Sequence, residues 1–141
     1  MIFVGGCPIV WGSKLQTEIA GSTMESEYIA LSEALKHLIV LKRLVVAFCP
    51  AIQIDPEEVS RIISTVFEDN SAALILSNLE PPRMTPRTKY FAIKYHWFRS
   101  MLKPLSIEIV PVDTEEQITD ILTKSLAVVK FERMRKKLVG W

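Results

Sequence analysis

The pattern of apolar and polar positions divides the chain into alternating predicted strands and helices. Segment 1–14 is apolar on both sides of Gly5–Gly6, a pair typical of tight turns, and predicts a β-hairpin. Segment 61–67 is rich in β-branched and aromatic residues and predicts a mostly buried strand. Segment 106–110 alternates and predicts another strand, and Pro111 beside it indicates a sheet edge. Because helical segments separate these strands, the pattern indicates the α/β class.

The longest predicted helix covers residues 23–48. Ser22–Glu25 matches a capping box, in which the Ser22 hydroxyl accepts a free N–H and Glu25 reaches back. We expect the buried stripe of this helix to consist of apolar residues three or four positions apart, namely Leu31, Ala34, Leu38, Leu41 and Val45. Segment 49–60 is predicted as a connecting loop with room for one short turn of helix. A second helix is predicted at 71–78.

The pattern of residues near the C-terminus predicts a final helix, and this helix contains a carboxylate with no evident structural role. Asp113–Gln117 offers two overlapping caps for the start of this helix. Asp120 then falls inside the helix beside Ile121, where Asp is a poor helix former and gains nothing obvious. Several basic residues farther on complement a helix C-terminus, namely Lys130, Arg133, Arg135, Lys136 and Lys137.

Composition and charge change this picture little. Hydrophobic residues at 49% and charged residues at 23% are ordinary for a globular protein, and 141 residues fit a single domain over 1–141. Lys plus Arg at 17 against Asp plus Glu at 16 gives a net charge of +1, so affinity for nucleic acid must come from local clustering. Cys7 and Cys49 have no metal-type spacing and fit a reducing compartment or simple apolar packing. We expect neither a membrane span nor a signal peptide.

The segment 83–103 is the most biased in the chain, with six basic residues, five aromatic residues and no acidic one. One interpretation is a nucleic-acid surface, for which the candidate contacts are Arg83, Arg87, Lys89 and Lys94. The other is a packed amphipathic helix with solvated lysines, since some apolar residues have helical spacing, namely Phe91, Tyr95, Phe98 and Leu102. His96 is expected to be structural or hydrogen-bonded, because no second metal ligand stands one turn away.

Three carboxylates lack a sufficient structural role or stand where a strand ends, namely Glu27, Asp69 and Asp120. Glu27 precedes Leu31 by four residues on the predicted core stripe, although an exposed first-turn acid stabilised by the helix dipole also fits. Asp69 ends a strand, where α/β sheets gather ligands, although Asp69 or Asn70 also fits a cap for the helix 71–78. If these carboxylates converge, they favour Mg²⁺ or Mn²⁺, and two such ions can activate water against a phosphodiester.

Several sequence blocks occur in the order of one known family. They are Pro8–Trp11 with Ser13–Lys14 and Gln16–Thr17, Ser22–Ala34, Glu68–Ala73, Arg87–Lys89 leading to Tyr95–Arg99, and Thr119–Leu126. Together they resemble the ribonuclease H domain of copia-type LTR retrotransposon Pol polyproteins. The resemblance covers essentially the whole chain. It implies a mixed five-stranded sheet flanked by helices and metal-dependent cleavage of the RNA strand of an RNA–DNA hybrid.

The resemblance also implies site residues and partners. Glu27 matches the catalytic glutamate of the first helix, Asp69 the aspartate ending the fourth strand, and Asp120 the aspartate opening the last helix. The implied cofactor is Mg²⁺ or Mn²⁺. The implied partners are an RNA–DNA hybrid, held by basic residues around Arg87 and Lys89, and an upstream reverse transcriptase segment. We expect an intracellular location, cytoplasmic or nuclear, without a membrane.

The departures from the family pattern limit the expected activity. The family's first metal-binding aspartate lies on the first, central strand, upstream of anything in these 141 residues. We therefore expect a domain incomplete at its N-terminus, without that strand, with weakened metal binding and weak or absent hydrolysis. The alternative is a non-catalytic remnant that acts at most as a nucleic-acid-binding or protein-docking module. Tyr90, Ala92 and Ser125 also stand where the family commonly has His, Asp and Pro.

Overall fold

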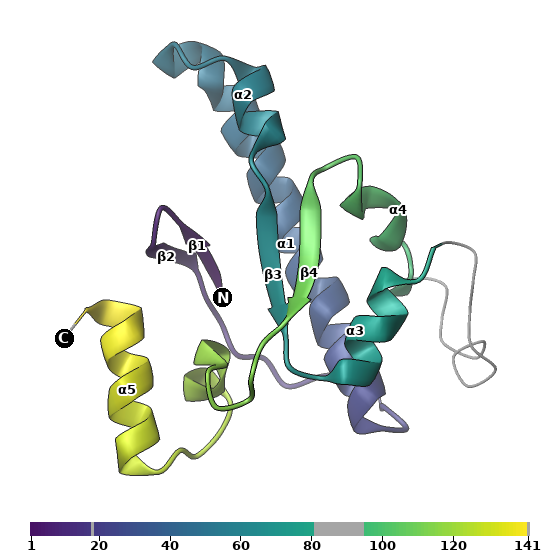
Figure 1. The fold of residues 1–141 in the computed structure, drawn as a ribbon, viewed down its shortest axis with the longest axis vertical. Coiled ribbons are helices and arrows are strands. Elements are labelled where there is room, and N and C mark those ends of the chain that lie inside the picture. The colour runs from purple at the N-terminus through teal and green to yellow at the C-terminus, as the bar shows by residue number, and fades with distance from the viewer. Residues whose placement is uncertain (18, 81–94, 141) are drawn as a thin grey trace. The chain divides into compact units, whose positions relative to one another are not determined.

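The chain forms two compact units in its computed structural model, which describes residues 1–17, 19–80 and 95–140 (Figure 1). Unit 1 comprises Met1–Ile19 and Val112–Trp141, and unit 2 comprises Ala20–Pro111. Among these described residues, each unit contains one two-stranded sheet, antiparallel in unit 1 and parallel in unit 2. The α/β class is confirmed, whereas the described residues form no five-stranded sheet. The single domain and the missing central strand stay predictions.

The long helix of unit 2, α1 (Thr23–Phe48), has the predicted limits. The Ser22 hydroxyl accepts the Glu25 N–H at 3.2 Å, as the capping box predicts. The Glu25 carboxylate reaches back to the N–H of Gly21, at 2.7 Å, one residue earlier than the motif requires. The cap thus fixes the start of α1.

The buried face of α1 differs from the predicted stripe. Its buried residues are Tyr28, Ile29, Leu31, Ser32, Leu35, Ile39 and Lys42. Ala34 and Val45 were predicted inside and are exposed. The prediction failed because apolar residues occur on several faces of α1, so spacing alone does not choose the face. The true face also admits two polar groups that find partners, since Ser32 accepts a hydrogen bond from Trp97 and Lys42 donates to three oxygens.

The sheet of unit 2 pairs β3 (Ser64–Glu68) with β4 (Ile107–Pro111), which lie side by side in Figure 1. The register runs from Ser64 opposite Ile107 to Glu68 opposite Pro111. Ile107 and Ile109 are buried, and the strand 106–110 is confirmed one residue later than predicted. Among the described residues β4 pairs only with β3, which agrees with the predicted edge position.

The predicted strand 61–67 is wrong at its start and in its burial. The 3₁₀ helix η1 (Cys49–Ile52) and the helix α2 (Pro56–Arg61) occupy the predicted loop, and α2 ends on Arg61. Asp55 caps α2 by accepting the N–H of Glu57 at 2.9 Å. Because this cap supports a second helical turn, β3 begins only at Ser64, and Phe67 on its outer face is 57% exposed.

Two further helices complete unit 2. Helix α3 (Ser71–Asn78) has the predicted limits. Helix α4 (Arg99–Leu102) is shorter than the helix expected around 91–102, because the described residues 95–98 are not α-helical; Phe91 lies outside the described residues. The core of unit 2 joins α1, α3, β4 and α4, and its fully buried side chains include Tyr28, Leu35 and Phe98.

Unit 1 begins with the predicted hairpin. Strands β1 (Ile2–Val4) and β2 (Cys7–Val10) are antiparallel, and Gly5 and Gly6 have φ of 57° and 81°, which favours glycine at both positions. Strand β2 ends at Val10, four residues earlier than the predicted return strand.

The final helix also starts later than predicted. Asp113 accepts the N–H of Glu115 at 2.8 Å and closes a local turn, so the acidic segment does not start an α-helix. The 3₁₀ helix η3 (Ile118–Leu122) follows, and helix α5 (Val128–Val139) begins only afterwards. Within the ranges 1–17, 19–80 and 95–140, no helix has both the length and the apolar character that a membrane crossing requires.

Candidate metal centre

Three carboxylates of unit 2 converge at the C-terminal end of β3. One oxygen each from Glu27, Glu68 and Asp69 lies within 4.8 Å of the other two. Glu27 belongs to the first turns of α1, Glu68 is the last residue of β3, and Asp69 follows it. The structure therefore brings together Glu27 and Asp69, which the sequence predicted, and adds Glu68, which it did not.

Asp69 does not cap helix α3. Asn70 has that role, because its Oδ1 accepts the N–H groups of Ala72 at 3.1 Å and Ala73 at 3.0 Å. The sequence left the cap open between Asp69 and Asn70, and the structure assigns it to Asn70. The Asp69 carboxylate therefore belongs to the cluster, where it is half-buried.

Glu27 lies one turn before the buried Leu31 on α1 and is itself half-buried. The helix thus turns this carboxylate toward the end of β3, where it meets Glu68 and Asp69. The alternative of a fully exposed first-turn acid is not what the structure shows. A half-buried carboxylate beside two others needs a compensating charge or a proton.

Glu68 is the buried member of the cluster, with 6% of its surface exposed. Its Oε1 accepts the N–H of Asn70 at 3.0 Å. Burial raises the pKa of Glu68 to about 7; the Asn70 N–H lowers it, and the charges of Glu27 and Asp69 raise it further. The signal that could have identified Glu68 is a carboxylate closing a strand next to Asp69, since a strand end is where ligands gather.

The cluster fits a divalent cation. Three carboxylates within 4.8 Å repel one another when ionised, and a divalent cation between them would offset that repulsion. An all-oxygen set is what Mg²⁺ and Mn²⁺ prefer. Glu27, Glu68 and Asp69 would hold such an ion, with α1 fixing the first and β3 the other two.

Asp120 belongs to unit 1, so its predicted convergence with Glu27 and Asp69 stays a prediction. It lies in η3 rather than in an α-helix and is 4% exposed. Its two carboxylate oxygens contact lysine ammonium groups, Lys124 at 2.8 Å and Lys130 at 3.5 Å. In this structure two lysines balance the charge of the Asp120 carboxylate.

The basic candidates for nucleic-acid contact, Arg83, Arg87, Lys89 and Lys94, lie outside the described residues, so that interpretation stays a prediction. The aromatic side chains that follow pack inward, as the alternative predicted: Tyr95 and Phe98 are buried. His96 is buried, and its Nδ1 lies 3.0 Å from the Tyr28 hydroxyl, which confirms that it is hydrogen-bonded.

Comparison with known proteins gives relatives that include three Pol polyproteins of plant transposons. The chain is 38% identical over 138 residues to a retrovirus-related Pol polyprotein from transposon TNT 1-94 of Nicotiana tabacum. It is 28% and 26% identical, over the same length, to the retrovirus-related Pol polyproteins from transposons RE2 and RE1 of Arabidopsis thaliana. Each match covers 98% of this chain and 9% of the relative. No family model and no solved structure matches the chain.

The homologues of this chain are therefore retrovirus-related Pol polyproteins of plant transposons, and the chain corresponds to a segment of such a polyprotein. It spans about a tenth of the length of the relatives that it matches. This agrees with the retrotransposon part of the resemblance seen in the sequence.

Proposed function

We propose that this chain is a ribonuclease H-type segment of a retroelement Pol polyprotein that binds a divalent metal ion through Glu27, Glu68 and Asp69. The observation that carries the proposal is the convergence of these three carboxylates within 4.8 Å at the end of β3. The family's sequence blocks and the Pol polyprotein relatives support the same assignment. The proposed substrate is the RNA strand of an RNA–DNA hybrid.

The residues have separate roles in this proposal. When bound, Mg²⁺ would activate a water molecule and balance the charge of the scissile phosphodiester. Glu27 and Asp69 hold the ion from two elements. Glu68 adds a third oxygen from inside the fold, where the Asn70 N–H orients its carboxylate. Asp120 stays a candidate ligand on the ground of its sequence position and the resemblance, and Arg87 and Lys89 are proposed on the same two grounds to hold the nucleic-acid backbone.

The expected turnover of the 141-residue chain is low. In the family that the sequence resembles, an aspartate on an earlier strand contacts both metal ions, and these 141 residues do not contain it. Two-metal hydrolysis needs ligands that position both ions. We therefore expect metal binding with hybrid cleavage near the uncatalysed background.

A cleavage assay tests this function. The 141-residue chain and its Asp69→Asn variant are incubated with an end-labelled RNA–DNA hybrid in Mg²⁺ and in EDTA. We expect at most slow, Mg²⁺-dependent cleavage that Asp69→Asn removes. Fast cleavage lost in Asp69→Asn would support the metal site and contradict the low turnover. Cleavage unaffected by both EDTA and Asp69→Asn would contradict the proposed function itself.

A further inference from the structure

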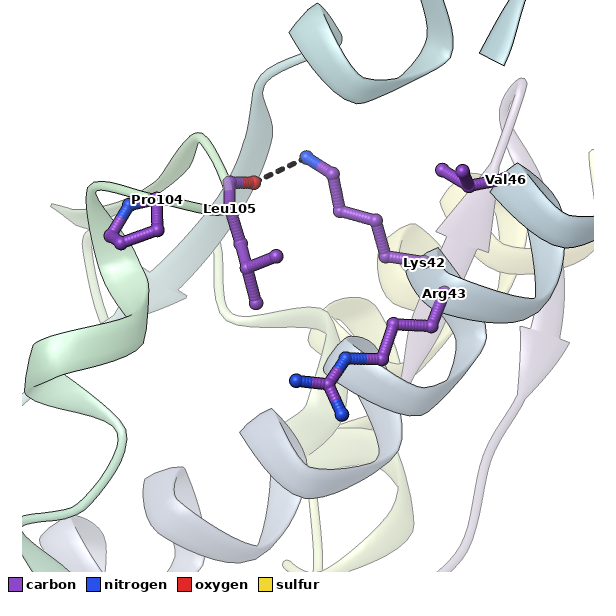
Figure 2. A pocket seen from close by; sticks show the side chains of 5 residues that line it. All are labelled: Lys42, Arg43, Val46, Pro104 and Leu105. Carbon is purple, nitrogen blue, oxygen red and sulfur yellow. Dashed lines mark hydrogen bonds between the residues drawn. The ribbon is translucent and has the colours of Figure 1, made fainter. Parts of the chain in front are cut away.

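A second polar site lies in unit 2, at the start of β4 rather than at the end of β3. A cavity of about 210 Å³ opens between α1 and the turn before β4 (Figure 2). It is lined by Lys42, Arg43, Val46, Pro104 and Leu105. Two of these residues are cationic, three are apolar and none is acidic. Lys42 is 15 positions from Glu27, about 22 Å along α1, so this cavity is separate from the metal centre.

Lys42 places a charge inside the protein, since only 9% of the residue is exposed. Its Nζ donates to the carbonyl oxygens of Ile62 at 2.7 Å and Leu105 at 2.5 Å, and to Ser64 Oγ at 3.3 Å. All three acceptors are neutral, and within the described ranges Lys42 forms no ion pair. Burial lowers the pKa of the Lys42 ammonium. A buried ammonium without an opposite charge has an electrostatic cost that a nearby anion would offset.

The three N–H groups of Lys42 already have acceptors, so hydrogen bonds to a ligand in this cavity would come from Arg43. Figure 2 shows both side chains extending from α1 toward Pro104 and Leu105. Arg43 is exposed, and the described part of the chain offers it no ion pair. A guanidinium carries five N–H donors in a planar fork that suits the oxygens of a phosphate.

We propose that this cavity binds a phosphate group, as free phosphate or as a phosphodiester. The Arg43 guanidinium donates hydrogen bonds to the phosphate oxygens, and Lys42 attracts the anion by its charge while keeping its three contacts. Val46, Pro104 and Leu105 form an apolar wall beside the buried Lys42, and such surroundings strengthen the attraction between its charge and an anion. Free phosphate carries more charge than a carboxylate opposite the two cations, and the oxygens of either phosphate form suit the planar fork of the guanidinium.

NMR titration of the full 141-residue chain tests the site. Sodium phosphate is added at an ionic strength held constant with sodium chloride, and the amide signals of Val46 and Leu105 are followed. We expect saturable shifts of these signals. Arg43→Gln should weaken binding about tenfold, because a charge-assisted hydrogen bond is lost. The matched control Arg61→Gln removes an exposed arginine of α2 that pairs with Glu57, and it should leave the affinity unchanged.

A second probe separates the two sources of phosphate. A short single-stranded oligonucleotide without terminal phosphates is titrated in the same way. Saturable shifts at Val46 and Leu105 with this probe identify a phosphodiester as the ligand, and shifts with inorganic phosphate alone identify free phosphate. Both results support the site. The proposal is overturned if neither probe shifts these signals. It is also overturned if the probe binds the Arg43→Gln variant with the same affinity as the unaltered chain.

Discussion

Glu68 is buried at the end of β3 and lies beside two other carboxylates, Glu27 and Asp69. Each of these conditions disfavours its ionised form. The Asn70 N–H opposes them only in part, so the pKa of Glu68 rises to about 7. Without a metal ion this residue therefore links the stability of the fold to pH.

The first prediction concerns this linkage. Between about pH 4.5 and pH 7 the unfolded chain has released the Glu68 proton while the folded chain retains it, so the free energy of unfolding falls as pH rises. The pKa difference corresponds to a fall of about 3 kcal/mol. Urea unfolding in EDTA, measured across this range, should show it. Glu68→Gln should reduce the pH dependence by this amount, and an unchanged slope would contradict the assigned environment.

The second prediction separates the cap from the metal ligand. Asn70→Ala removes the acceptor of two N–H groups of α3 and should lower the free energy of unfolding by about 1 kcal/mol. Asp69→Asn should leave the unfolding free energy in EDTA unchanged or higher, since it removes one of three repelling charges. Urea unfolding of both variants is the measurement. The assignment fails if Asp69→Asn costs as much as Asn70→Ala.

The sequence identified Glu27 and Asp69 but not Glu68, for a physical reason. A carboxylate at the end of a predicted strand has no defined direction, because one residue of register decides which face it joins. The strand was predicted over 61–67 and in fact ends on Glu68, so this side chain was left outside the strand. Only the observed register places it beside Glu27.

At the scale of elements, local chemistry determined helix limits better than helix faces. The Ser22 cap fixed the start of α1, and Asn70 fixed the start of α3, because a cap depends on a few neighbouring residues. The buried face of α1 depends on which partners the rest of the chain supplies. Lys42 turns inward because Ile62 and Leu105 offer carbonyl oxygens, and such a contact between distant residues cannot be inferred from spacing.

Helix α5 shows a similar limit. The start of this helix was predicted at 113–117, because that acidic segment carries capping residues. In the structure the segment forms a turn whose acids pair with basic residues of α5. Lys130 and Arg133 each contact Glu115, at 3.3 Å and 3.6 Å, and Lys137 pairs with Glu116. Met134 is the buried apolar anchor of α5. Ion pairs therefore connect this helix to the acidic turn, beside the apolar contact of Met134.

The third prediction follows from these ion pairs. Because Glu115, Glu116 and Arg133 are exposed, salt should screen the attraction strongly. Raising sodium chloride from about 0.1 M to about 1 M should speed amide hydrogen exchange along α5. The exchange of buried α1 residues such as Leu35 is the internal control and should not change. Salt-independent exchange in α5 would show that apolar packing dominates its docking.

At the scale of the molecule, the sequence predicted the class of fold and the kind of relative, but not the arrangement of the sheets. Each of the family's sequence blocks consists of neighbouring residues and can be recognised by itself, whereas a sheet depends on pairings between distant strands. The described strands form two separate pairs, in unit 1 and unit 2. Glu27, Glu68 and Asp69 all lie in unit 2, so the proposed metal site requires only that unit to be folded.

The most direct test is therefore metal binding by the 141-residue chain. Mn²⁺ binding is measured by electron paramagnetic resonance above pH 7, where Glu68 is ionised. We expect one ion per chain, with affinity at least about tenfold weaker in Asp69→Asn and in Glu68→Gln because each loses a charged ligand. The control Glu108→Gln, an exposed acid on β4, should bind as the unaltered chain does. Absence of binding to the unaltered chain would contradict the account, and so would an affinity in Asp69→Asn and Glu68→Gln equal to that of the unaltered chain.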